Sequence, residues 1–166
     1  MRDIRGLAFE ITYKIFSNRD YNIKRYFSSE NICGQALAYQ NRAELRNLVA
    51  GIIRKKILLD FIIRKYSIKP FHSIKLKERI PLYIGIFELL FTTTPDYAAV
   101  NENISLIKKA LKNFRLARLA NAMLKKISFE KDLIFKDAKA AGLSIEYSTP
   151  EWIIEELNNL DYLKKE

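Results

Sequence analysis

The sequence predicts an all-α fold, and two observations support this prediction. Apolar residues recur every three or four positions along most of the 166-residue chain, which is the spacing of residues on one face of an α-helix. No segment alternates apolar and polar residues between turn signals, as half-buried strands do. A chain of this length can bury a single core. We therefore expect a compact bundle of about seven or more helices.

The first half of the chain predicts two helices and a longer helical stretch. The first helix runs to about Ser17, with an apolar stripe formed by Ile4, Leu7, Ala8, Ile11 and Ile15. A short helix follows around residues 23–27, and a loop through Gly34 comes next. The longest stretch keeps helical spacing of apolar residues from Leu45 to Ile63 and closes at Lys69-Pro70, because proline disfavours a helical residue before it.

The second half predicts the centre of the bundle. Residues 76–91 are apolar at so many positions that their helix must be buried on most sides. Pro81 lies near its start, where it either occupies the first turn or kinks the helix. Helices near residues 97–111 and 115–127 follow. Gly51 and Gly85 lie inside helical patterns, and we expect close approach of a neighbouring helix there, with backbone contact to a ligand as the alternative.

The net charge of +10 is concentrated in the body of the chain. Eleven basic residues and three acidic ones lie between Arg42 and Arg79, and seven basic residues and no acidic one lie between Asn103 and Ile127. After Ser128 nine acidic residues meet five lysines. We therefore expect a surface for polyanions on the basic body and a different role for the acidic tail.

Several classes of site and location are excluded by composition. Cys33 and His72 are the only cysteine and histidine, which makes disulfides, tetrahedral zinc sites and Cys-His nucleophilic pairs improbable, and Cys33 is expected to be a small buried apolar residue. The N-terminus lacks the pattern of a secretory signal, and no apolar run is long enough to cross a bilayer. The sequence predicts a soluble cytoplasmic protein without a metal or membrane contact.

Four ordered motifs resemble those of NusB-like domains. The stretch from Arg42 to Asp60 resembles their R-A-x-x-x-x-L-V-x-G-x-x-R segment followed by L-D, and residues 82–91 resemble their L-R-L-G-x-Y-Q-L-L-F helix. Residues 95–102 are similar to P-x-x-A-A-V-N-E-A-V, and residues 121–125 to N-A-V-L-R. The resemblance covers roughly residues 2–127 and implies a NusB-like helical bundle.

Three positions depart from the pattern. Tyr83 stands where the family usually has arginine, Glu88 stands where it has glutamine, and Asn41 stands where an aspartate often precedes the Arg-Ala pair. An acidic side chain in place of glutamine and the absence of that arginine both argue against RNA contacts by this helix. The apolar spacing is intact, so the expected fold is unaffected.

The C-terminal segment distinguishes between two kinds of NusB-like protein. Such domains occur as the free antitermination factor NusB, which normally ends near the position of Ile127, and at the N-terminus of 16S rRNA cytosine-C5 methyltransferases of the Sun/RsmB type. Residues 147–152 resemble the Y-S-H-P-x-W segment that leads toward the methyltransferase domain. The resemblance therefore implies an RNA-binding domain over residues 1–128 and an acidic helical extension over residues 129–166, toward a methyltransferase domain absent from this sequence.

The chain alone is expected to be catalytically inert. A cytosine-C5 methyltransferase that uses S-adenosylmethionine needs a glycine loop after a strand, an acidic residue for the ribose and a cysteine nucleophile. The five glycines here are scattered, no strand is expected, and Cys33 lacks the neighbouring proline of such enzymes. We expect no cofactor, and the sequence looks like a separated or truncated N-terminal part of a larger enzyme.

Binding is then the expected activity, with RNA, most of all 16S rRNA, as the partner and with no DNA contact. Arg2 and Arg5 match the place where NusB-like proteins carry an arginine-rich RNA contact, although solvated charges would look the same. Asn101 and Glu102 are expected to bond backbone or to cap between helices. The candidate RNA-binding residues are Arg2, Arg5, Arg42, Arg46, Arg54, Lys55, Lys56, Lys108 and Lys112.

Two alternatives stay open at the level of sequence. One is a stand-alone NusB-type transcription antitermination factor that binds RNA together with a ribosomal protein. The other is a protein-interaction module without RNA affinity. The apolar face expected at Trp152, Ile153, Leu157 and Leu160 would pack on a methyltransferase domain, fold back on the helical body or stay exposed as an adhesive surface.

Overall fold

The computed structural model describes residues 4–28 and 39–163, and these residues form ten α-helices and no strand. In chain order the helices are α1 (Ile4–Asn18), α2 (Ile23–Ser28), α4 (Tyr39–Arg54), α5 (Lys56–Tyr66), α6 (Leu76–Phe91), α7 (Asp96–Leu111), α8 (Phe114–Phe129), α9 (Lys131–Ala140), α10 (Leu143–Tyr147) and α11 (Glu151–Leu163), and a short 3-10 helix, η1 (Phe71–Ser73), precedes α6. The predicted all-α bundle is confirmed. Arg2 and Cys33 lie outside the described residues.

Helix α6 is the centre of the bundle, as its apolar sequence predicts. Every residue from Ile80 to Leu89 is buried, and α1, α4, α5, α7 and α8 all pack against this helix. Pro81 lies in the second turn of α6, so it falls after the first turn, and the helix continues through it. Its ring removes the hydrogen bond that residue 81 would donate to the carbonyl of Lys77.

The two helical glycines are sites of close side-chain approach, as predicted. A β-carbon built on Gly51 would lie 2.0 Å from Cζ of Phe87, so the ring of α6 occupies the space of a side chain on α4. A β-carbon on Gly85 would lie 2.8 Å from Cδ1 of Leu124 and 3.2 Å from Cγ of Asn103. Glycine therefore sets how closely α4, α7 and α8 approach α6.

The long helical stretch from Leu45 to Ile63 is not one helix, which corrects the sequence prediction. It breaks at Lys55, where α4 ends and α5 begins. A continuous helix would bond the N–H groups of Ile57 and Leu58 to carbonyls one turn earlier. Both groups instead donate to the side-chain oxygen of Ser148, at N···O distances of 3.0 and 3.2 Å. A residue far along the chain thus caps α5.

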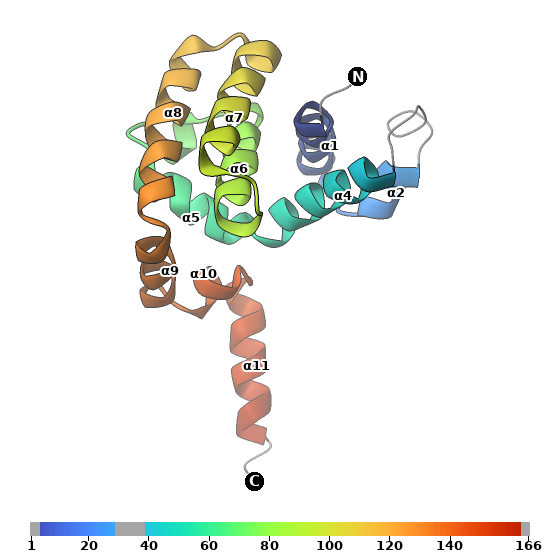
Figure 1. Ribbon diagram of the computed structural model, residues 1–166. Coiled ribbons are helices and arrows are strands. Elements are labelled where there is room, and N and C mark those ends of the chain that lie inside the picture. Colours follow the sequence, from blue (N-terminus) through green and yellow to red (C-terminus); the bar gives the residue numbers. More distant parts are fainter. Residues whose placement is uncertain (1–3, 29–38, 164–166) are drawn as a thin grey trace.

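The C-terminal helices are attached to the body through α5. Helices α9 and α10 both pack on α5, and Lys65 on α5 forms an ion pair with Asp137 on α9. Helix α11 contacts α10 and extends away from the bundle in Figure 1. Trp152, Leu157 and Leu160 are 66%, 53% and 51% exposed, so the predicted apolar face is not folded back on the body. No helix in the described part of the chain is long and apolar enough to cross a membrane.

Candidate nucleic-acid interface

The first group of predicted site residues lies on α4. Leu45, Val49 and Ile52 are buried and turn one face of α4 toward the core. Arg46 and Arg54 lie away from that face, and Arg42 is exposed near the start of the helix, seven residues before Val49. The side chains of Arg42, Arg46 and Arg54 are exposed and form no ion pair with a described residue. We call these three residues the α4 cations.

An aromatic ring lies beside one of the α4 cations. The guanidinium carbon of Arg46 lies 5.4 Å from the ring centroid of Phe27 on α2, within the range of a cation–π contact. Arginine planes and aromatic rings are the groups on which unpaired RNA bases stack. This pair adds a stacking element to the positive face.

A groove continues from the α4 cations across the α4–α5 junction. Its volume is about 490 Å³, and Arg54, Lys55, Phe87, Phe91 and the segment 147–149 line it. The ammonium of Lys55 lies 5.6 Å from the ring centroid of Phe91. Tyr147 is 61% exposed at the edge of this groove. The cations here were predicted from the sequence, but Tyr147 was not, because nothing local links it to residues about ninety positions earlier.

Lys56 contacts an acidic and an aromatic side chain of the same chain. Its ammonium lies 2.7 Å from the carboxylate of Asp60 one turn later and 6.0 Å from the ring centroid of Phe16. Asp60 also accepts a hydrogen bond from the hydroxyl of Tyr83. Burial, and after it the charge of Asp60, raises the pKa of the Tyr83 hydroxyl far above its ordinary value. Tyr83, the departure from the family arginine, is thus part of an internal polar cluster.

Arg5 is also engaged inside the protein. Its Nε lies 2.9 Å from Oε1 of Glu88 on α6, and the Nδ2 of Asn103 donates to the other Glu88 oxygen at 2.8 Å. Burial raises the pKa of the Glu88 carboxyl, while the charge of Arg5 opposes that shift. The arginine that was predicted to contact RNA therefore ties α1 to the buried carboxyl that replaces the family glutamine.

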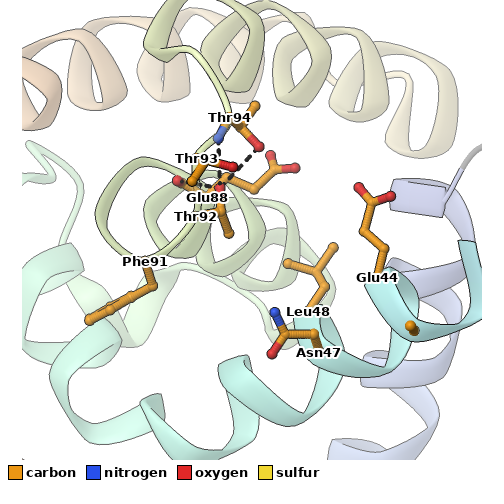
Figure 2. Close-up of a pocket in the computed structure, with 9 residues that line it drawn as sticks. Glu44, Asn47, Leu48, Glu88, Phe91, Thr92, Thr93 and Thr94 are labelled. Carbon is orange, nitrogen blue, oxygen red and sulfur yellow. Dashed lines mark hydrogen bonds between the residues drawn. The ribbon is translucent and has the colours of Figure 1, made fainter. Parts of the chain in front are cut away.

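A cavity of about 550 Å³ lies next to this cluster, between α4 and the end of α6 (Figure 2). Glu44 and Glu88 contribute carboxyl groups to its lining, and residues 92–94 contribute three threonines. The Thr92 hydroxyl donates to the backbone oxygen of Glu88, and residues 92 and 94 are hydrogen bonded to each other. Because carboxylates repel phosphates, this cavity does not belong to the nucleic-acid interface.

The remaining predicted residues lie on a second positive surface. Lys108 is exposed near the end of α7, and Lys112 is exposed in the left-handed conformation that ends the helix. Lys109, Arg115 and Arg118 are exposed beside them, and residues 103–129 contain no acidic side chain. None of these five forms an ion pair with a described residue. The α7–α8 cations are Lys108, Lys109, Lys112, Arg115 and Arg118.

Apart from Arg5 and Lys56, the predicted site residues that the structure describes therefore fall into two separate groups. In Figure 1 the α7–α8 turn lies at the top of the view, whereas the α4–α5 junction lies at mid-height, just above α10. The prediction for Asn101 and Glu102 was wrong. Both side chains are exposed and make no hydrogen bond with the described residues, and the buried amide is Asn103 instead.

Comparison with known proteins places this arrangement in a family. The NusB family profile matches residues 2–129, a range that ends with α8. Ribosomal RNA small subunit methyltransferase B of Escherichia coli O1:K1 / APEC is 25% identical over 123 residues, which are 74% of this chain and 28% of that protein. Probable ribosomal RNA small subunit methyltransferase B of Bacillus subtilis (strain 168) is 28% identical over 156 residues, 92% of this chain and 34% of that protein.

The chain thus spans about a third of the length of these curated relatives. The match to the Bacillus subtilis protein extends past Phe129 into the C-terminal helices, because it covers 92% of the chain. The family match alone covers well over half of the residues and confirms the resemblance of the four motifs. This chain belongs to the NusB family.

Proposed function

We propose that this chain is a non-catalytic RNA-binding domain that recognises small-subunit rRNA for a methyltransferase of the B type. One observation carries the proposal: the α4 cations and the α7–α8 cations are exposed and lack acidic partners among the described residues, while aromatic rings lie beside Arg46 and Lys55. Lysine and arginine side chains that neutralise phosphates release the counterions condensed on the nucleic acid, and that release drives binding. The relatives named above are rRNA methyltransferases, which supports rRNA as the nucleic acid that is bound.

The interface we assign consists of the α4 cations, Lys55, Lys108 and Lys112. Arg5 and Lys56 contribute to the folded structure through Glu88 and Asp60, so we expect them to affect stability before they affect RNA binding. The groove at the α4–α5 junction offers Tyr147 as an additional stacking partner.

We propose different roles for residues 1–128 and residues 129–166. The first part carries the cations that bind RNA, and the second contributes Tyr147 to the groove at the α4–α5 junction and extends toward a methyltransferase domain. The exposed apolar face of α11 would pack on that domain. Trp152 is the only tryptophan, so its emission reports directly on this contact. A blue shift on addition of the methyltransferase domain of the Bacillus subtilis relative supports the role, and an unchanged emission spectrum argues against it.

The test of RNA recognition is a competition measured by fluorescence anisotropy. A labelled small-subunit rRNA hairpin is displaced by unlabelled hairpin, by a single-stranded antiterminator-type RNA and by duplex DNA of equal length. The proposal predicts that the rRNA hairpin competes best. Preference for the single strand would favour an antitermination factor. If duplex DNA competes as well as the hairpin, the protein binds nucleic acids through charge alone and does not recognise rRNA.

A further inference from the structure

Two helix faces meet in a groove on the α7–α8 hairpin. Residues 101, 104, 105 and 108 of α7 fall at spacings of three, one and three, and residues 114, 117, 118 and 121 of α8 repeat the same spacings. Such residues share one face of a helix. These two faces line a cavity of about 630 Å³, formed by Asn101, Ile104, Ser105, Lys108, Phe114, Ala117, Arg118 and Asn121.

The chemical groups are ordered along this groove. Helices α7 and α8 are antiparallel neighbours joined by a short turn (Figure 1). Lys108, Phe114 and Arg118 therefore lie toward the turn, and the amides of Asn101 and Asn121 lie toward the other end. The seven-residue span on each helix corresponds to about 10 Å along the helix axis. The groove thus offers cations and a ring at one end and two amides at the other.

The polar and aromatic groups of the groove are not engaged in contacts that stabilise the fold. Phe114 is 66% exposed, so burial does not account for a large ring at the first position of α8. No side-chain hydrogen bond or ion pair with the described residues is made by Asn101, Ser105, Lys108, Arg118 or Asn121. Ala117 is only 3% exposed, and its small side chain leaves the groove open. These groups are available to a ligand.

We propose that this groove binds one unpaired nucleotide of an RNA. The base stacks on the ring of Phe114, Lys108 and Arg118 contact the flanking phosphates, and the amides of Asn101 and Asn121 pair with the edge of the base. An amide carries both a donor and an acceptor, which matches the mixed edges of nucleobases. Unpaired bases that stack on aromatic side chains are the usual target of sequence-specific RNA recognition.

The groove chemistry favours a nucleotide over an acidic peptide. A peptide carboxylate would use the cations, but it would leave the exposed ring and the two amides at the far end without partners. A nucleotide uses all three kinds of group, and residues 103–129 add no acidic side chain that would repel its phosphate. This inference rests on the proposed RNA-binding function and locates one specific contact of it.

The test uses two RNA hairpins that differ by a single bulged nucleotide. Binding of the 166-residue chain to each is measured by fluorescence anisotropy for the wild type, Phe114→Ala, Phe114→Tyr and Lys109→Gln. Lys109 is the matched control, because it is exposed next to Lys108 but does not line the groove. Circular dichroism melting of each variant checks that the fold is retained, which the exposure of Phe114 predicts.

We expect the bulged hairpin to bind more tightly than the fully paired one. Phe114→Ala should weaken binding of the bulged hairpin at least about five-fold, since stacking on an aromatic side chain contributes about 1–3 kcal/mol per base. It should leave binding of the paired hairpin unchanged, and Phe114→Tyr should restore the preference. Lys109→Gln should weaken the binding of both hairpins equally.

Three results would overturn the inference in distinguishable ways. If Phe114→Ala weakens binding of both hairpins to the same extent, as Lys109→Gln is expected to do, the groove binds no base, while the proposed RNA-binding function stands. If the wild type binds neither hairpin, the RNA-binding function itself is wrong. If poly-glutamate displaces the bulged hairpin at the same concentration as unlabelled RNA does, the groove binds an acidic peptide.

Discussion

The side-chain oxygen of Ser148 lies 3.0 Å from the backbone nitrogen of Ile57 and accepts its hydrogen bond. Ser148 also accepts from Leu58, so one hydroxyl satisfies two of the N–H groups that the start of α5 leaves without a helical partner. Ser148 itself has a φ of 55°, in the left-handed region. The segment that resembles a linker motif is therefore hydrogen bonded to the helical body shortly before α11 begins.

Removal of this hydroxyl should destabilise the protein. Ser148→Ala removes the cap and keeps the unfavourable φ, and we expect the free energy of unfolding, measured in urea, to fall by about 1 kcal/mol or more. Ser148→Gly also removes the cap but accommodates the φ, so it should cost less. If Ser148→Ala were as stable as the wild type, the hydrogen bonds from α5 to Ser148 would contribute nothing to the fold.

Gly51→Ala should be strongly destabilising because the new methyl group would lie 2.0 Å from Cζ of Phe87. Overpacking of this kind costs roughly 1–3 kcal/mol, and thermal unfolding monitored by circular dichroism will measure it. The double variant Gly51→Ala/Phe87→Leu should recover part of this stability. Gly6→Ala is the matched control, since no atom lies within 4 Å of its added carbon and helix propensity favours alanine.

The stability of the protein should depend on the ionisation of Glu88. Burial raises the pKa of this carboxyl above its ordinary value of 4.5, and the nearby charge of Glu44 adds to the shift while Arg5 opposes it. The folded state then holds the proton to higher pH than the unfolded state does. The stabilisation from this group is therefore present below about pH 4.5 and is lost as the pH rises through the raised pKa.

Glu88→Gln should reduce this pH dependence. Glutamine retains an oxygen that can accept from Asn103, and it cannot ionise. We expect the free energy of unfolding of Glu88→Gln to fall less than that of the wild type between about pH 4.5 and neutral pH in urea titrations. Glu10→Gln, which removes an exposed carboxyl from α1, is the control for the change in net charge. Identical slopes for Glu88→Gln and the wild type would contradict this role of Glu88.

Periodicity predicted the helices because their core positions are local in sequence. The apolar spacing at Leu45, Val49 and Ile52 identified the buried face of α4, and the same spacing placed its cations outside. The interpretation of Gly51 and Gly85 was correct: glycine destabilises a helix interior, so its presence there indicates that a neighbouring side chain occupies the space of a β-carbon.

Three of the errors share one cause, which is dependence on distant residues. Nothing near Lys55 signals a helix end, because the group that caps α5 is Ser148. Arg5 looked available for RNA because its partner Glu88 lies on another helix. The groove between α7 and α8 was missed for a related reason, since the polar face of each helix alone resembles ordinary solvated surface. Only the packing of the two helices brings Lys108 and Phe114 into one site.

The measurement that tests the central claim most directly is the salt dependence of binding to the small-subunit rRNA hairpin. The matched variants are Arg42→Gln/Arg54→Gln, which removes two α4 cations, and Lys136→Gln/Lys139→Gln, which removes two exposed lysines of α9. The logarithm of the association constant should fall linearly with the logarithm of salt concentration, and the α4 variant should have a slope shallower by roughly 0.7–0.9 for each phosphate that it no longer neutralises. The α9 variant should retain the wild-type slope. Equal slopes for all three proteins, or binding of the wild type that is insensitive to salt, would contradict an RNA interface on α4.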